Sequence, residues 1–324
     1  MKTKPIVSLM FLVLILTACG PNPSESSVPT TSEDLSSEVV SSEDVTSETV
    51  TTSESTQVST SVNEDPIVSP NIEFTIAEPY TGTFWNGLNT ELEGQALRDH
   101  LNTFMWSKFK KIDYNTCSDA ILEMDQDPNN PNNVLSLYDL NSVKKSSQNV
   151  LWNREHTFPQ SKLADGNADL RAGATKKNLS SDAANLFACD NDLNEKRSNN
   201  SFINLDLEEK YEQYTIYNLH GTRTDNFNYR GYFAPTQKVR GEIARAQLYM
   251  LIMYPENCSL SENFSLGDML TWNLEYAPTV ERDLQRNTGL EKYQDLRNPF
   301  IDMPELGCKI FSDINPSTRS ACAV

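Results

Sequence analysis

Residues 153–161 read NREHTFPQS and place one of the three histidines of the chain directly after a glutamate. The apolar residues 150–152 (VLW) precede this stretch and predict a buried strand. Neighbouring side chains on a strand point to opposite sides, so Glu155 and His156 can face one pocket only if the chain turns there. Pro159 favours such an end to the strand. A carboxylate at this turn can bind a hard cation, while the imidazole accepts a proton from water.

A second polar segment, residues 181–199, reads SDAANLFACDNDLNEKRSN. Its apolar run ANLFA predicts another strand. Asp190 or Asn191 is a suitable N-cap for a helix that begins directly after it. On that helix Asn194 and Arg197 lie one turn apart on the same face, so the amide oxygen of Asn194 can face a metal with the arginine beside it.

Together these segments resemble the bacterial endonuclease I family of secreted, non-specific DNA and RNA nucleases, which use a ββα-metal motif. The resemblance spans roughly residues 80–307 and rests on five blocks in the same order. They are DQDPNNPNN followed by an apolar run, NREHTFPQS, DxxNLFACDxxxNxxRSN, VRGEIARAQLYM and LRNPFIDMPEL. The resemblance implies an α+β fold, with a ββα-metal (His-Me finger) nuclease core surrounded by helices.

The same resemblance implies a role for three residues. Glu155 and Asn194 would bind one divalent ion, with Mg²⁺ expected and Mn²⁺ or Ca²⁺ as alternatives. His156 would be the general base that activates water, and the reaction would leave a 5′-phosphate. The ion would keep most of its coordination sites for water and substrate.

The arginine that stabilises phosphate charge in this family is not fixed by the sequence. Arg154 adjoins the Glu-His pair, Arg197 lies on the predicted metal helix, and Arg171 lies in the connecting loop. All three remain candidates for phosphate binding, and a surface salt bridge is the alternative for each.

Two positions depart from the family pattern. Many members have a histidine where this chain has Ala184, and many read HPE where this chain has Met303 followed by PE. Of the other two histidines, His220 is interpreted as a loop residue and His100 as a surface or capping residue.

Several segments predict scaffold rather than chemistry. Residues 91–109 carry apolar side chains at helical spacing. Residues 238–254 predict a helix that is buried on most sides, and residues 280–286 predict a further helix. Residues 125–133 are rich in turn-forming residues, and the VLSLYDL run after them predicts a strand.

The N-terminal residues predict an anchor and a spacer. Residues 1–19 combine two lysines, a short apolar run and the sequence LTAC, which resembles a lipoprotein signal peptide with Cys19 as the site of lipid attachment. Residues 20–70 are rich in Ser, Thr and Glu and predict a disordered linker. Residues 71–324 are then a single nuclease domain, lipid-anchored to the outer face of the cytoplasmic membrane or released.

Net charge and cysteine content limit how the protein can bind a polyanion and how many disulfides it can form. The net charge is −18, and −10 remains once the ten acidic residues of the linker and the two lysines before it are set aside. Any contact with a polyanion must therefore use a local basic groove or a metal. Without Cys19, five cysteines remain, which permits one or two disulfides of undetermined pairing.

Two functions of different classes follow from these observations. The first is a surface-anchored, metal-dependent endonuclease that hydrolyses phosphodiester bonds of DNA and RNA without sequence preference, with no protein partner implied. The alternative is a catalytically decayed lipoprotein that binds polyanions or a host surface, which the alanine at position 184 and the acidic balance favour.

Overall fold

The computed structural model describes residues 72–206, 214–219, 222–258 and 263–323. The chain divides into two units, Met1–Ser61 and Val62–Val324, and all of the described residues belong to the second. The predicted signal peptide, Cys19, the linker and His220 lie outside the described residues, so these predictions are not addressed by the structure. In the part of the chain that is described, no helix is both long and apolar enough to span a bilayer.

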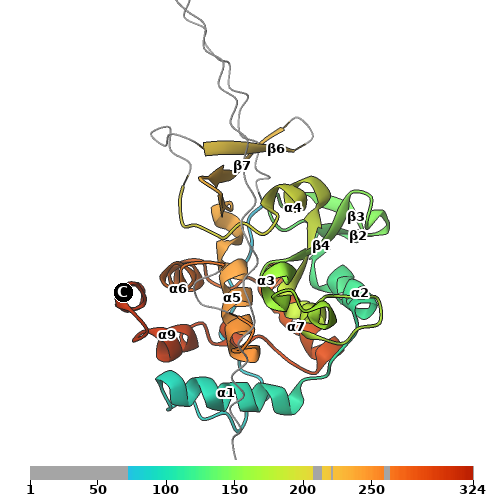
Figure 1. The fold of residues 1–324 in the computed structure, drawn as a ribbon. Helices are drawn as coiled ribbons and strands as arrows, with labels where there is room; N and C mark the ends of the chain where they lie inside the picture. The colour runs from blue at the N-terminus through green and yellow to red at the C-terminus, as the bar shows by residue number, and fades with distance from the viewer. Residues whose placement is uncertain (1–71, 207–213, 220–221, 259–262, 324) are drawn as a thin grey trace, which may run out of the picture. The chain divides into compact units, whose positions relative to one another are not determined.

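The helix α5 (Gln237–Met253) lies at the centre of the helical part of the fold (Figure 1). Every residue from Val239 to Met253 is buried, which confirms the prediction of a helix that is buried on most sides. Three helices pack against it: α1 (Gly94–Lys108), α6 (Leu266–Glu275) and α8 (Pro299–Asp302). This packing makes α5 the scaffold on which the rest of the domain is assembled.

The predicted helix at residues 91–109 is α1, and its side chains cap the C-terminal end of α5. The last carbonyls of a helix have no partner within the helix. Here Arg98, Asn102 and Trp106, which are spaced by four residues on one face of α1, donate hydrogen bonds to the carbonyls of residues 251, 252 and 253. Three side chains on one face of α1 therefore provide the hydrogen-bond donors for the last carbonyls of α5.

Further helices lie around this scaffold. They are α2 (Tyr114–Met124), α3 (Gln160–Ala164), α7 (Gln285–Gln294), α9 (Leu306–Phe311) and α10 (Pro316–Ala321). The predicted helix at residues 280–286 is confirmed as a helical segment, although its first turn, Val280–Leu284, is a π-helix that leads into α7. A disulfide joins Cys308 to Cys322, while Cys117, Cys189 and Cys258 are buried thiols.

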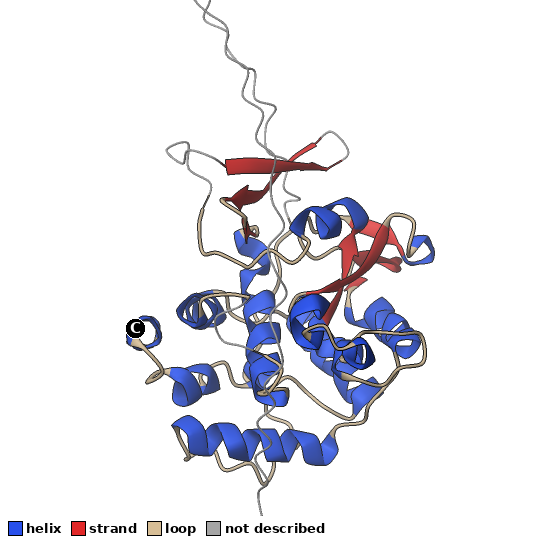
Figure 2. Cartoon of the chain, in the orientation of Figure 1, coloured by secondary structure: helices blue, strands red, loops and turns tan. Residues whose placement is uncertain are grey.

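The strands gather in two regions, shown in red in Figure 2. One region holds an antiparallel sheet of β1 (Gln126–Asp127), β2 (Asn130–Leu135) and β3 (Ser142–Lys144). The same region holds a separate antiparallel pair, β4 (Trp152–His156) and β5 (Leu186–Asp190). The other region holds β6 (Tyr214–Leu219), β7 (Thr222–Tyr229) and β8 (Tyr232–Ala234). The expected α+β class is confirmed.

The predicted limits of the turn at residues 125–133 and of the strand after it are wrong. The strand β2 begins at Asn130, within the stretch read as a turn, and ends at Leu135. Residues 136–140 form a buried turn instead of continuing the strand. Leu140 donates its N–H to the carbonyl of Ser136, and Leu137 donates to the carbonyl of Ala188 on β5. The backbone groups of this apolar run are thus satisfied by a turn and by β5.

The prediction of a buried strand at residues 150–152 is also wrong for its first two residues. Val150 is 71% exposed and Leu151 is 47% exposed, and only Trp152 is buried. Asn149 has a positive φ of 63°, which ends the preceding segment in a turn. The backbone amides of residues 150 and 151 both donate to the carbonyl of Ser147. These two amides are therefore used in a local turn and do not pair with a neighbouring strand.

Candidate active site

The pair β4–β5 and the helix α4 (Asn191–Arg197) form a ββα unit (Figure 1). The register pairs Trp152 with Asp190 at one end and His156 with Leu186 at the other. The helix α4 begins directly after β5, because the side chain of Asp190 accepts hydrogen bonds from the amides of Asp192 and Leu193. The N-cap predicted at this position is confirmed.

A pocket of about 330 Å³ lies between β4, α3 and α4. The sequence-predicted residues Glu155, His156 and Asn194 all line it, although Asn194 is 39 positions from the glutamate. Its other lining residues are Arg154, Pro159, Gln160, Ser161, Arg197, Ser198 and Asn199. The ββα unit therefore brings the proposed metal ligands and the proposed base to one pocket.

Glu155 and His156 contact opposite sides of β4, as neighbours on a strand do. The glutamate contacts Tyr138 and Arg197, whereas the histidine contacts Tyr114 and Ser180. Both still reach the pocket because β4 ends at His156.

The carboxylate of Glu155 is only 3% exposed and is held by two donors. Its Oε1 accepts a hydrogen bond of 2.7 Å from the Tyr138 hydroxyl and one of 3.0 Å from Nη1 of Arg197. Burial raises the pKa of Glu155, and the Arg197 charge and the Tyr138 hydrogen bond act in the opposite direction. Since both donors bind Oε1, Oε2 is the oxygen that can bind a cation.

The imidazole of His156 is oriented by two contacts. Its Nε2 lies 2.9 Å from the carbonyl oxygen of Ser180, and its ring stacks on Tyr114 with 5.8 Å between the centroids and 16° between the planes. A carbonyl only accepts, so Nε2 carries the hydrogen and Nδ1 carries the lone pair. Burial lowers the pKa of His156 to about 4. The ring is therefore neutral at pH 7, with Nδ1 ready to accept a proton.

The side chain of Asn194 is oriented by the backbone and side chains of β4. Its Nδ2 donates to the Oδ1 atom of Asn153 and, at 3.5 Å, to the carbonyl of Arg154. Among the described residues no donor reaches Oδ1 of this amide. The Nδ2 atom of Asn194 is therefore hydrogen-bonded to β4, while its Oδ1 atom can bind a ligand.

The three candidate arginines occupy different environments. Arg197 is fully buried and donates to Glu155 and to the carbonyls of His156 and Thr157 at 2.8–3.0 Å. Arg154 is half-buried and its Nη1 donates to the carbonyl of Tyr114 and to Ser118, with the guanidinium 3.6 Å from the centre of the Tyr114 ring.

Arg171 is exposed in the loop after α3, and its side chain makes no ion pair with any described residue. Of the three arginines, it is therefore the one whose guanidinium is not already engaged by protein groups. Arg197 instead serves as the buried charge partner of the glutamate, and it fixes the junction between β4 and the segment after it.

Three residues that hold the site, Tyr114, Tyr138 and Ser180, have no signal in the sequence. Each lies in a different segment, and each reaches the Glu-His pair only through the tertiary fold. Ala184, which stands where many family members have histidine, is buried in the 3₁₀ turn Ala183–Asn185 and does not line the pocket.

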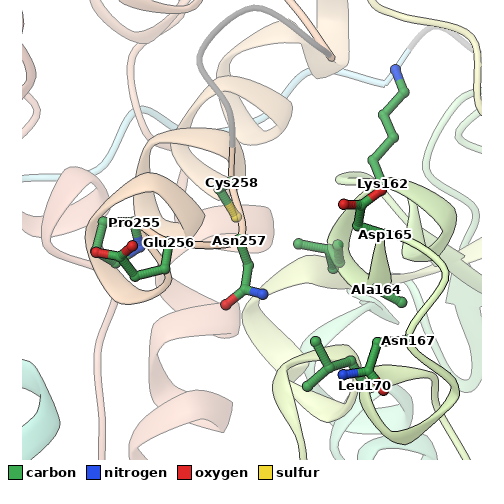
Figure 3. Close-up of a pocket in the computed structure, with 10 residues that line it drawn as sticks. Lys162, Ala164, Asp165, Asn167, Leu170, Pro255, Glu256, Asn257 and Cys258 are labelled. Atoms are coloured by element: carbon green, nitrogen blue, oxygen red, sulfur yellow. The ribbon is translucent and has the colours of Figure 1, made fainter. Parts of the chain in front are cut away.

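A separate cavity of about 430 Å³ lies between α3 with the loop after it and the residues that follow α5 (Figure 3). Lys162 and Asp165 line one side, and Glu256 and Asn257, just after α5, line the other. The amine of Lys162 donates to Ser201 at 3.0 Å, and two carboxylates face the same space. This mixture of charges does not suit a phosphate, so the cavity is not assigned to the nuclease site.

Comparison with known proteins matches this architecture to a family. The model of the Endonuclease I family matches residues 85–305. An extracellular ribonuclease of Bacillus subtilis (strain 168) is 30% identical over 255 residues, which cover 72% of this chain and 81% of the relative. An extracellular ribonuclease of Bacillus amyloliquefaciens is 30% identical over 236 residues, covering 67% of this chain and 74% of the relative.

The α+β fold and its family match define a nuclease, a hydrolase that acts on nucleic acids. More particularly, the chain belongs to the endonuclease I family. The resemblance stated from residues 80–307 is thereby confirmed.

Proposed function

We propose that this protein is a metal-dependent endonuclease that hydrolyses DNA and RNA without sequence preference and leaves 5′-phosphate ends. The observation that carries this proposal is the meeting of Glu155, His156 and Asn194 at one pocket of about 330 Å³. A neutral imidazole with a fixed donor on one nitrogen and a lone pair on the other suits general-base chemistry.

In this proposal Nδ1 of His156 takes the proton from the attacking water. The Ser180 carbonyl holds the opposite ring nitrogen, so that the imidazolium formed after proton transfer keeps a hydrogen-bond acceptor at Nε2. Tyr114 stacks on the ring and limits its rotation. These two contacts fix the direction in which the base accepts the proton.

The donor set fits a hard divalent cation such as Mg²⁺, with Mn²⁺ and Ca²⁺ as alternatives. Oε2 of Glu155 and Oδ1 of Asn194 are the oxygens that remain for it. In the described segments, no cluster of three or more His, Cys, Asp or Glu side chains is arranged for a metal. When bound, the ion would polarise the phosphate and stabilise the charge of the leaving oxygen.

All three arginines are proposed as phosphate contacts. Arg154 and Arg197 line the pocket, whereas Arg171 is exposed in the loop after α3 and does not line it. Contacts to phosphates carry no sequence information, which supports cleavage without sequence preference. The lining of the pocket includes no exposed aromatic ring that would read a base.

The proposed location is the cell surface, through a lipid on Cys19, with release as the alternative. The support is the N-terminal sequence itself, together with the two relatives that are named extracellular ribonucleases. The linker that the sequence predicts, about fifty residues long, would let the nuclease domain reach roughly 40 Å from the anchor.

Plasmid DNA and a transfer RNA incubated with the protein and Mg²⁺, with and without EDTA, test the proposal. Both substrates should be degraded only when the metal is present, and His156→Ala should lower the rate by about 10²–10⁴-fold. His100→Ala is the matched control, because this histidine only accepts a hydrogen bond from the amide of Asn89. Binding without cleavage by the unsubstituted protein would support the alternative of a decayed, polyanion-binding lipoprotein.

A further inference from the structure

Four exposed lysines lie in two segments, and each segment leads along the chain to a residue that contacts His156. They are Lys110 and Lys111, between α1 and α2, and Lys176 and Lys177, in the loop after α3, and together they are called the lysine tract. Within the described parts of the chain, none of the four forms an ion pair with a carboxylate. Buried arginines of the domain are paired in this way, for example Arg245 with Asp283 and Arg286 with Asp125.

The first segment is joined to the site by Tyr114, the residue that stacks on the base. Lys111 precedes Tyr114 by three residues, which limits the separation of their backbones to roughly 10 Å. The amide of Lys110 donates to the carbonyl of Gln294 at 2.9 Å, which fixes the backbone of this segment. The ammonium of Lys111 lies 5.3 Å from the centre of the Trp106 ring, which holds the charge at the surface.

The second segment is joined to the site by Ser180, whose carbonyl accepts from His156. Lys177 precedes Ser180 by three residues, which again limits the separation of their backbones to roughly 10 Å. The loop is braced internally: the Ser180 hydroxyl donates to the carbonyl of Leu170 at 2.6 Å, and the Lys176 amine donates to the carbonyl of Ala168 at 2.8 Å.

The two segments lie beside each other at the start of α2. The amide of Asn115 donates to the carbonyl of Ala174 at 3.1 Å, which joins the loop to this helix (Figure 1). Asp113, between the first segment and α2, is the N-cap of α2, and its side chain accepts from the amide and hydroxyl of Thr116 at 2.9 Å. Hydrogen bonds from Thr116, and to a lesser extent the charge of Lys177, lower the pKa of Asp113.

We propose that the lysine tract binds the sugar-phosphate backbone of the polynucleotide beyond the cleaved bond, so that the strand leaves the pocket past Tyr114 and along these lysines. This inference rests on the proposed nuclease function. A domain with a net charge of −10 outside its N-terminal segments needs such a local surface to hold a polyanion. Phosphate contacts of this kind position a substrate without reading its sequence.

The test compares two charge-matched double variants of the full-length protein. Lys110→Gln with Lys177→Gln removes one charge from each segment, at side chains for which no hydrogen bond or ion pair is found in the described structure. Lys309→Gln with Arg319→Gln removes the same charge from exposed positions on α9 and α10. Each duplex phosphate contact adds about 0.9 to the slope of log affinity against log salt.

For a long duplex, kcat/KM should therefore fall less steeply with salt in the tract variant, by roughly tenfold between 50 and 200 mM, than in the unsubstituted protein. The control variant should keep the original salt slope. Hydrolysis of a dinucleotide, which has one phosphodiester bond and does not extend to the tract, should stay within about twofold in both variants.

Binding of the same duplex, measured by fluorescence anisotropy over the same salt range, tests the tract without requiring cleavage. A tract variant that keeps the original salt slope in binding and in hydrolysis would overturn the proposal. So would an equal loss of dinucleotide hydrolysis, because it would indicate damage to the catalytic pocket. Absence of cleavage by the unsubstituted protein would refute the nuclease function, while the binding slopes would still decide the tract.

Discussion

Replacing Arg197 by methionine should destabilise the domain severely, because it leaves the carboxylate of Glu155 buried without its charge partner. The guanidinium is fully buried, and the glutamate is 3% exposed. The carbonyls of His156 and Thr157 lose the hydrogen bonds from the arginine in the same substitution, although the Asn263 amide still donates to that of Thr157. Breaking a buried ion pair by removing one partner costs about 3–5 kcal/mol, and we expect Arg197→Met to fall in this range.

The double variant Glu155→Gln with Arg197→Met should be more stable than Arg197→Met alone. Removing both charges eliminates the unpaired buried carboxylate, which is the largest part of the cost. We expect roughly 2 kcal/mol to be recovered, as a coupling energy between the two positions. The single substitution Glu155→Gln should cost less than Arg197→Met, because the arginine keeps its two carbonyl acceptors.

Urea unfolding followed by tryptophan fluorescence measures these differences, since Trp152 is buried in β4 next to the pair. Arg154→Met is the control, because this arginine is half-buried and its Nη1 donates to a carbonyl and a hydroxyl rather than to a carboxylate. If Arg197→Met cost less than about 1 kcal/mol, or if the two substitutions were additive, the buried ion pair would not hold the site as argued.

Three further predictions follow from the site and the C-terminal helices. Because burial lowers the pKa of His156 to about 4 from 6.5, its contribution to stability is present above pH 6.5 and is lost between pH 6.5 and 4. The loss is about 3 kcal/mol at most, and unfolding at pH 7 and pH 4 should differ less in His156→Gln. Asn194→Ala should raise the Mg²⁺ concentration for half-maximal rate at least about tenfold, while Lys309→Gln should not. Replacing Cys308 and Cys322 by serine should lower the free energy of unfolding by roughly 3 kcal/mol in calorimetry, and an unchanged melting temperature would contradict the bridge.

Helical periodicity and capping predict the scaffold well. The apolar spacing of residues 91–109 and 238–254 identifies α1 and α5, because amphipathic or fully apolar helices must bury those faces. The sequence offers Asp190 or Asn191 as the N-cap of α4. The structure has Asp190 there, and its side chain satisfies amides that the helix leaves without partners. Both features depend on residues close together in the sequence, and the folded domain retains them.

Strand limits are harder to predict from local pattern. The run at residues 150–152 is apolar enough for a strand, yet Asn149 turns the chain and exposes Val150. The run at residues 136–140 is buried as expected, but as a turn whose amides pair with distant segments. Burial and strand geometry are separate properties, and an apolar pattern indicates only the first.

The contacts that tune the site depend on tertiary structure. The sequence places Glu155 beside His156, but it contains no sign that Tyr138 donates to the carboxylate or that Ser180 accepts from the imidazole. The separate environments of the three arginines are likewise a result of packing. Only the fold distinguishes Arg197, which is buried, from Arg171, which is exposed.

The central claim is that Glu155 and Asn194 bind one divalent ion in the pocket that His156 lines. The most direct measurement is the crystal structure of the protein with Mn²⁺, located by its anomalous scattering. The account predicts a single ion bound by Oε2 of Glu155 and Oδ1 of Asn194 at about 2.0–2.6 Å, with the rest of its sphere made of water. An ion bound elsewhere, or an empty pocket in crystals of protein that still requires the metal for cleavage, would contradict it.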